Sequence, residues 1–173
     1  MGTVPTVMAH CIHLSGVEMD RMADTQTMVS HCPYSNVNLS SGIAPIHKLF
    51  ERNIPIGLGS DISGGHIVSM AKVLTNAIGL SKMKWAEVDQ NYAPLTLSEA
   101  FYMATKGGGQ FFGHVGSFEN GCELDALIID DTSLFDPNER SLEERLERWL
   151  YVGDDRHIIE RYVAGRVVPS PKG

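Results

Sequence analysis

Several features that would assign the chain to a special class are absent from its 173 residues. It has three cysteines, an odd number at wide spacings, which suits a reducing compartment better than a disulfide framework. No apolar run approaches the roughly 18 residues of a membrane-spanning helix. The first residues lack the charged and apolar regions of a signal peptide. We therefore expect a cytoplasmic protein with no membrane partner.

Positive charge is also in short supply. The chain has 14 Lys and Arg against 21 Asp and Glu, which gives a formal net charge of -7. An acidic protein repels phosphate backbones, so we expect no nucleic-acid partner. Hydrophobic residues make up 43% and charged residues 20% of the chain, which is ordinary for a soluble domain and predicts a packed core rather than disorder.

Common catalytic and phosphate-binding signatures are missing as well. The glycines at 64–65 and 107–109 match neither G-x-G-x-x-G nor the P-loop, so we interpret them as residues that mark where helices begin or end. The sequence contains no H-E-x-x-H motif, and it lacks the H-x-E and P-C-x-x-C pair of cytidine deaminases. Any chemistry must come from another arrangement.

The hydrophobic pattern predicts alternating strands and helices. Ser15 with Glu18 and Thr96 with Glu99 form capping boxes, each of which marks the start of a helix. The expected strands cover 6–10, 27–31 and 54–58, and the expected helices cover 15–24, 44–52, 67–82 and 96–104. We expect a polar linker at 84–93 and a helix break at the glycines of 107–109. This order favours an α/β fold, with a parallel sheet and helices outside it.

The pattern changes after about Gly113. A strand is predicted over 124–129 and a charged helix over 141–150. Two further strands, 158–163 and 166–168, flank Ala164-Gly165, which suits a two-residue hairpin turn. We therefore predict an α/β domain over 1–112 and a β element with a charged helix over 113–173.

Polar clusters follow each of the first three predicted strands. Carboxyl ends of parallel strands share one edge, and α/β barrels gather their active sites there. Each cluster alone has a plainer explanation, because a histidine at a strand end is more often structural and an aspartate there often caps a helix. Three in succession predict a single pocket. The clusters are His10-Cys11-Ile12-His13, His31-Cys32-Pro33-Tyr34-Ser35-Asn36 and Gly59-Ser60-Asp61.

In this order the clusters resemble the amidohydrolase superfamily and, within it, the guanine deaminase family. The shared motifs are A-H-x-x-x-L-S at 9–15, H-C-P-x-S-N at 31–36 and G-L-G-[ST]-D-x-x-G-G at 57–65. The second motif, together with Gly-Asp-Asp-Arg at 153–156, favours guanine deaminases more narrowly. The resemblance implies the C-terminal portion of a TIM-type (β/α)8 barrel, about three strands (six to eight) with their helices, plus strands of a small β-sandwich domain.

The resemblance also implies a chemistry, the zinc-dependent hydrolytic conversion of a small purine, guanine, to xanthine and ammonia. By it, Asp61 binds zinc and shuttles a proton, while His10 stabilises charge near the attacked carbon. Zinc would lower the pKa of a bound water and so provide hydroxide. His31, Ser35 and Asn36 are implied to shape or support the substrate pocket.

The family's H-x-H metal pair, its further metal histidine and its general-acid glutamate have no counterpart in this sequence. A catalytic zinc needs about three protein ligands, and Asp61 supplies one. We therefore predict a truncated product that is inactive alone, with open sheet edges that favour a homo-oligomer or a complementing N-terminal half. Lys106 is a further departure, since an apolar residue is expected there. Two alternatives stay open: an amidohydrolase that deaminates a related heterocycle, and a non-catalytic assembly module.

Overall fold

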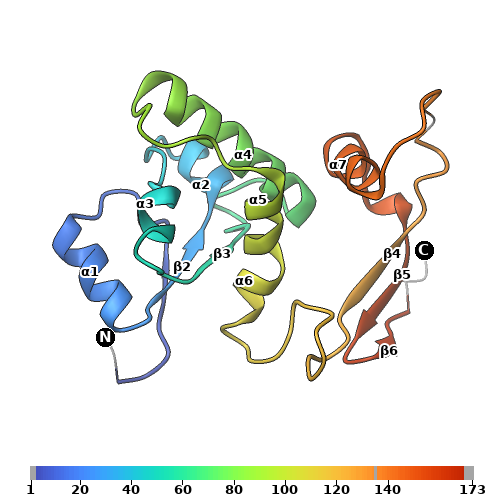
Figure 1. Cartoon of the computed structure of the whole chain (residues 1–173), viewed down its shortest axis with the longest axis horizontal. Coiled ribbons are helices and arrows are strands. Elements are labelled where there is room, and N and C mark those ends of the chain that lie inside the picture. The colour runs from blue at the N-terminus through green and yellow to red at the C-terminus, as the bar shows by residue number, and fades with distance from the viewer. Residues whose placement is uncertain (1–2, 135, 170–173) are drawn as a thin grey trace.

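A computed structural model describes residues 3–134 and 136–169 (Figure 1). The first half holds a three-stranded sheet in the order β1 (Val7–Ala9), β2 (Met28–His31), β3 (Ile56–Leu58). Both strand pairs are parallel, with Val29 of β2 placed between Met8 of β1 and Ile56 of β3. The predicted α/β order with a parallel sheet is confirmed. All three strands consequently end at the same edge.

Helices cover this sheet where the sequence pattern predicted them. They include α1 (Gly16–Asp24), α3 (Ile46–Phe50), α4 (Met70–Glu87) and α5 (Leu97–Ala104). The predicted capping boxes are present at Ser15 and Thr96. The side-chain oxygen of each accepts a hydrogen bond from the N–H of the third helical residue, a glutamate, and the carboxylate of that glutamate accepts one from the backbone N–H of the cap residue. Within the described residues, no helix combines the length and apolar character needed to cross a bilayer.

Two local predictions were wrong, and one helix was not predicted. β2 ends at His31, directly before Cys32-Pro33, and Pro33 is also the first residue of the unpredicted helix α2 (Pro33–Asn38), a position where its missing N–H costs nothing. The expected linker after 84 is helical as far as Glu87. The glycines of 107–109 lie within a short helix, α6 (Lys106–Gly109), where a Cβ on Gly107 would come within 2.7 Å of the Ile56 carbonyl oxygen. These glycines therefore allow α6 to approach β3 closely.

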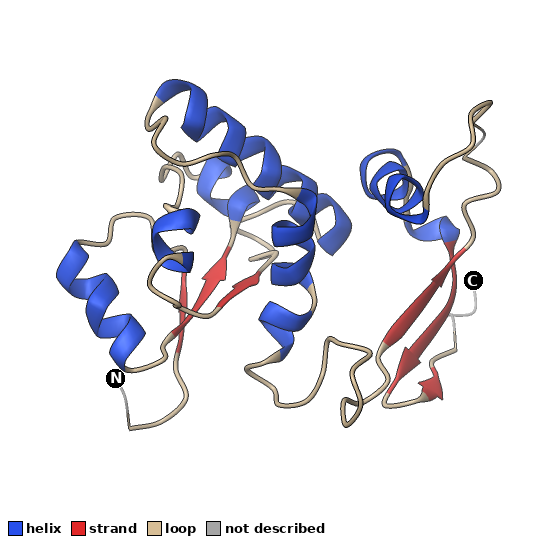
Figure 2. Ribbon diagram, viewed as in Figure 1, coloured by secondary structure: helices blue, strands red, loops and turns tan. Residues whose placement is uncertain are grey.

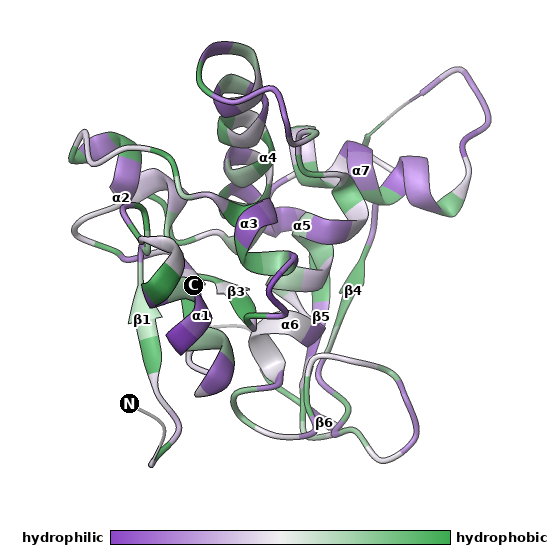
Figure 3. Cartoon of the chain, turned by 60° about the vertical axis from the view of Figure 1, so that its left-hand side comes forward, coloured by the Kyte–Doolittle hydropathy of each residue, from purple (hydrophilic) through white to green (hydrophobic). Residues whose placement is uncertain are grey.

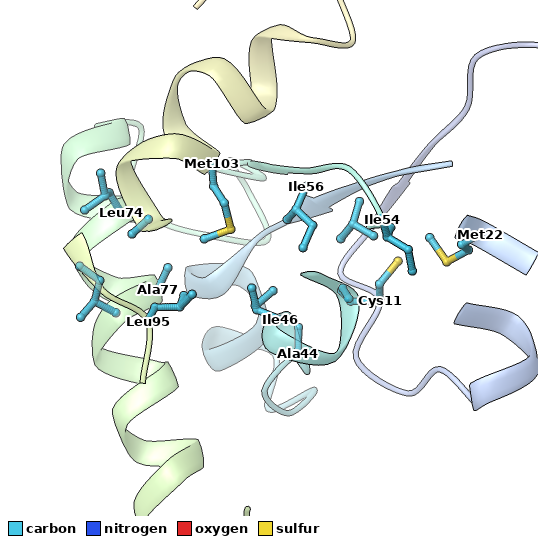
Figure 4. Close-up of a cluster of buried hydrophobic side chains, with 14 of the residues drawn as sticks. Cys11, Met22, Ala44, Ile46, Ile54, Ile56, Leu74, Ala77, Leu95 and Met103 are labelled. Atoms are coloured by element: carbon cyan, nitrogen blue, oxygen red, sulfur yellow. The ribbon is translucent and has the colours of Figure 1, made fainter. Parts of the chain in front are cut away.

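The core lies between the sheet and the helices (Figure 4). Val29 and Ile56 of the strands are fully buried there. They belong to one apolar cluster with Leu49 of α3, Leu74 of α4 and Met103 of α5. The helical layer therefore fixes the sheet that carries the polar clusters.

The edge strand β1 is different, because all three of its residues are exposed. Val7 is 42% exposed and Met8 37% exposed. The hydropathy colouring of Figure 3 shows this apolar strand at the outer edge of the sheet. Burying it would require another chain or segment.

The second half forms an antiparallel sheet (Figure 2). Its strands are β4 (Ala126–Ile129), β5 (Ile158–Val163) and β6 (Arg166–Val167), and α7 (Leu142–Val152) and the 3-10 helix η1 (Asp155–His157) lie between β4 and β5. The predicted hairpin turn is present, with positive φ at Ala164 (48°) and Gly165 (74°), as type I′ turns require. Lys72 of α4 joins the two halves, since its Nζ donates to the carbonyls of Leu150 (3.1 Å) and Tyr151 (2.9 Å) near the end of α7.

Candidate active site

The parallel sheet sets the positions of two chemically capable side chains. His10 directly follows β1, and its N–H donates to the Ser30 carbonyl (2.9 Å), which continues the ladder beyond the strand. The Gly59 N–H donates to the His31 carbonyl (2.9 Å) in the same way, and Asp61 comes two residues later. Backbone hydrogen bonds to β2 therefore hold both segments at the carboxyl edge.

The backbone turns sharply where these side chains begin. His10, Cys11 and Asp61 have φ values of 67°, 49° and 46°, the left-handed region that residues with a Cβ seldom occupy. Each such residue costs about 1–3 kcal/mol, and such residues gather at functional sites. The two sharp turns direct His10 and Asp61 toward each other.

Asp61, His10 and Asn36 form a row of polar groups. Nε2 of His10 lies 3.8 Å from Oδ2 of Asp61, and the two side chains are 40% and 38% exposed. On the other side of the ring, Nδ1 of His10 lies 2.9 Å from Oδ1 of Asn36, a residue of α2. The two residues that the sequence assigns to catalysis are thus neighbours at an open surface, with a buried amide behind them.

Gly64 completes this arrangement from the loop after Asp61. A Cβ on Gly64 would come within 2.6 Å of both Oδ2 of Asp61 and Oγ of Ser35. The Asn38 amide donates to the Gly64 carbonyl (2.7 Å) and so ties the loop to α2. The sequence predicted only that Gly64 marks a helix boundary, and it did not predict this proximity to Asp61 and Ser35. Its position three residues after Asp61 was the available signal.

Replacing Gly64 with alanine should disturb the site more than the fold. Its φ is not positive, so alanine is compatible with the backbone, and the added methyl group acts by pushing Asp61 and Ser35 apart. In an enzyme in which a partner segment completes this site, we expect about a tenfold loss of turnover. The reason is that small displacements of reacting groups lower the rate of the chemical step. Steady-state kinetics measures this. The matched control is Gly79→Ala on α4, where an added Cβ meets nothing within 4 Å; equal losses in both variants would contradict a local effect.

His31, Ser35 and Asn36 are buried, at 1%, 0% and 1% exposure. Within the described residues, no hydrogen-bond partner is found for Nδ1 of His31, Oγ of Ser35 or Nδ2 of Asn36. Ser35 and Asn36 lie beside the His10–Asp61 pair through the contacts given above. Polar atoms beside this pair that have no hydrogen-bond partner in the described part of the chain, such as Oγ of Ser35 and Nδ2 of Asn36, suit a site that binds a polar ligand.

His31 has different surroundings. It lines a cavity of about 30 Å³ bounded by α3, α4 and the segment that follows α4, with His47, Lys84 and Tyr92 among the lining residues. Burial, and secondarily the nearby charge of His10, lowers the pKa of His31 to about 4. A neutral imidazole on the helix side of the sheet fits a packing role, so a contribution of His31 to the substrate pocket stays a prediction.

The fit of a metal ion to these residues can be tested from their chemistry. The Asp61 carboxylate is partly exposed, which suits a metal ligand. Cys11 and Cys32 do not suit that role, because burial raises the pKa of both thiols and metals bind the thiolate. Among residues 3–134 and 136–169, no group of three or more His, Cys, Asp or Glu could hold a metal ion. Asp61 therefore fits one position of a zinc site.

Comparison with known proteins shows which family the chain belongs to. The sequence model of the Amidohydrolase family matches residues 1–168. The chain belongs to the amidohydrolase family. Among its relatives, a guanine deaminase from Dictyostelium discoideum is 41% identical over 170 residues, which are 94% of this chain and 38% of that protein.

Two solved deaminase structures have the same fold over most of this chain. Guanine deaminase from C. acetobutylicum, with guanine in its active site, is 51% identical with a TM-score of 0.92, and the match covers 96% of this chain and 40% of that one. A zinc-containing adenosine deaminase from Xanthomonas campestris is 24% identical with a TM-score of 0.76, over 93% of this chain and 36% of that one. The chain spans about two fifths of the length of the guanine deaminases that it matches.

Proposed function

We propose that this amidohydrolase chain is the part of a zinc-dependent guanine deaminase that carries its aspartate base and a neighbouring histidine. The observation that carries the proposal is the 3.8 Å approach of His10 Nε2 to Asp61 Oδ2 at the carboxyl edge of the parallel sheet. Similarity to proteins named guanine deaminase supports the choice of substrate. Under this proposal, 1–112 supplies strands six to eight of a TIM-type barrel, and 113–173 supplies strands of a β-sandwich domain.

The proposed reaction is the hydrolysis of an amino group on a purine ring. Water oxygen bonds to the ring carbon that bears the amino group, the carbon–nitrogen bond to that group breaks, and xanthine and ammonia form. Zinc, when bound through Asp61 and further ligands, supplies the Lewis acidity that lowers the pKa of water. Asp61 takes the proton that the water loses and delivers it to the departing amino nitrogen. His10, beside it, stabilises the charge that develops at the reacting carbon's substituents.

The chain alone provides too few ligands for this chemistry. A catalytic zinc needs about three protein ligands, and the described residues offer Asp61 but no cluster of three. We infer that the remaining ligands come from a complementing segment, and that the isolated chain is inactive. The exposed apolar residues of β1 support such a partner.

A direct assay tests the proposal. The purified chain with added zinc should release no ammonia from guanine. A chimera, in which this chain replaces the portion that it matches of the C. acetobutylicum enzyme, should release ammonia and form xanthine. A zinc-loaded, folded chimera with no activity on guanine would contradict the proposal. Adenine and pterins as parallel substrates separate guanine from related heterocycles.

One observation favours a second candidate, an assembly module without catalysis. A cavity of about 1110 Å³ lies along α5, β3 and β4, and apolar residues such as Met103, Leu127 and Trp149 line it. Size-exclusion chromatography of the isolated chain tests this candidate. Clean self-association together with an inactive chimera would favour assembly over deamination.

A further inference from the structure

We propose that Asn36 is a positioning residue that accepts a hydrogen bond from Nδ1–H of His10 and thereby turns Nε2 of the ring toward Asp61. This inference deepens the proposed deaminase and rests on it for its catalytic meaning. Two distances carry it. Nδ1 of His10 lies 2.9 Å from Oδ1 of Asn36, and Nε2 on the other side of the ring lies 3.8 Å from Oδ2 of Asp61.

Asn36 is held firmly enough to orient another side chain. It is 1% exposed and lies within α2, where its N–H donates to the Cys32 carbonyl (3.0 Å) and its own carbonyl accepts from the Ser41 N–H (2.8 Å). His10 is much more exposed, at 40% of its side chain, so its ring has fewer fixed neighbours than the Asn36 amide. The buried amide is therefore the fixed partner and the imidazole is the oriented one.

The direction of the hydrogen bond follows from what each atom can do. Oδ1 of Asn36 can only accept, so Nδ1 of His10 must donate. A reversed amide would require an unprotonated Nδ1, which exists only in the neutral ring. The observed orientation suits both the neutral and the protonated imidazole, because Nδ1 carries a hydrogen in each.

This arrangement determines which nitrogen is free. With Nδ1 bonded to Oδ1 of Asn36, Nε2 is the ring nitrogen that faces Asp61. In proteins, the bond made by one ring nitrogen sets the state of the other. The remaining Nδ2 of Asn36 has no partner among the described residues, so one buried donor stays available at the back of the site.

Nitrogen-15 NMR of the full chain tests the inference without any catalysis. In alkaline buffer, where imidazole is neutral, two-bond proton–nitrogen correlations report which ring nitrogen is protonated, and a His10→Gln sample assigns the signal. We expect the Nδ1–H form in the wild-type chain. We expect Asn36→Leu, which removes the acceptor, to shift His10 to the Nε2–H form, and Asn36→Asp, which keeps an acceptor, to restore Nδ1–H.

Asn76→Leu is the matched control, because it removes a side-chain amide from α4, whereas His10 contacts Asn36 of α2 and Asp61, so it should leave the His10 signal unchanged. An Nε2–H form in the wild-type chain would overturn the inference, and this measurement does not depend on whether a variant folds. An unchanged Nδ1–H form in a folded Asn36→Leu chain would overturn it too.

The same variants in the chimera separate the two proposals. Loss of an outer partner of a catalytic group typically costs about 10-fold to 100-fold, so Asn36→Leu should lower kcat by that factor and Asn36→Asp by less. An inactive chimera with His10 in the Nδ1–H form rejects the deaminase and keeps the Asn36 assignment. An active chimera with His10 in the Nε2–H form rejects the Asn36 assignment alone.

Discussion

Replacing Asp61 with asparagine in the chimera should lower the turnover of guanine by about 10⁴-fold, near the upper end of what a general base contributes. The amide keeps the size of the carboxylate, so the contacts with His10 and with the Gly64 loop are preserved. It lacks the negative charge, however, so it binds zinc more weakly and cannot take a proton from water. Ammonia release and the zinc content of the purified protein are the two measurements.

Asp20→Asn provides the matched control for this change. Asp20 lies on α1, where it forms an exposed ion pair with Arg52 at 3.0 Å. Exposed pairs of this kind contribute little to stability, so the variant should keep wild-type activity and zinc content. Retention of more than about a tenth of the activity by Asp61→Asn would exclude Asp61 as the base, given the 10²-fold minimum expected of one.

Acid should destabilise the chain through His31 as the pH falls from 6.5 to 4. The pKa of His31 is about 4 in the folded chain against 6.5 without burial. Between these values the unfolded chain binds a proton that the folded chain excludes, so the free energy of unfolding falls as the pH falls from 6.5 to 4. The expected loss is about 3 kcal/mol, and none follows below pH 4 from this group.

Urea denaturation at several pH values between 7 and 4 measures the loss. His31→Gln should flatten the curve in this window, whatever its stability at pH 7, because the titrating group is gone. His13→Gln removes an exposed histidine that contacts the Ser41 carbonyl and should leave the slope nearly unchanged. A His31→Gln chain that keeps the full slope would show that other groups cause the acid sensitivity.

Local signals were sufficient to predict most of the secondary structure. The capping boxes at Ser15 and Thr96 identified the starts of two helices, because their hydrogen bonds involve residues only three apart. Pro33 was ambiguous, since proline both ends strands and begins helices, and here both apply, because β2 ends at His31 and α2 begins at Pro33. The glycines of α6 required knowledge of β3, whose backbone they approach, and no sequence pattern contains that distance.

The site was predictable to the extent that the topology determines it. Parallel strands end at one edge, so the proximity of His10 and Asp61 followed from the order of the strands. The contact between Asn36 and His10 did not follow, because it depends on α2, a helix that the sequence analysis did not identify. The burial of His31 on the helix side of β2 also depends on tertiary packing.

The left-handed backbone at His10, Cys11 and Asp61 has a consequence for directed evolution. A library screened only for heat tolerance should enrich glycine or asparagine at these positions, because both residues accept this conformation more readily. The same substitutions would remove the imidazole and the carboxylate on which the proposed deamination depends. Screening for stability and screening for chemistry should therefore select opposite residues at His10 and Asp61.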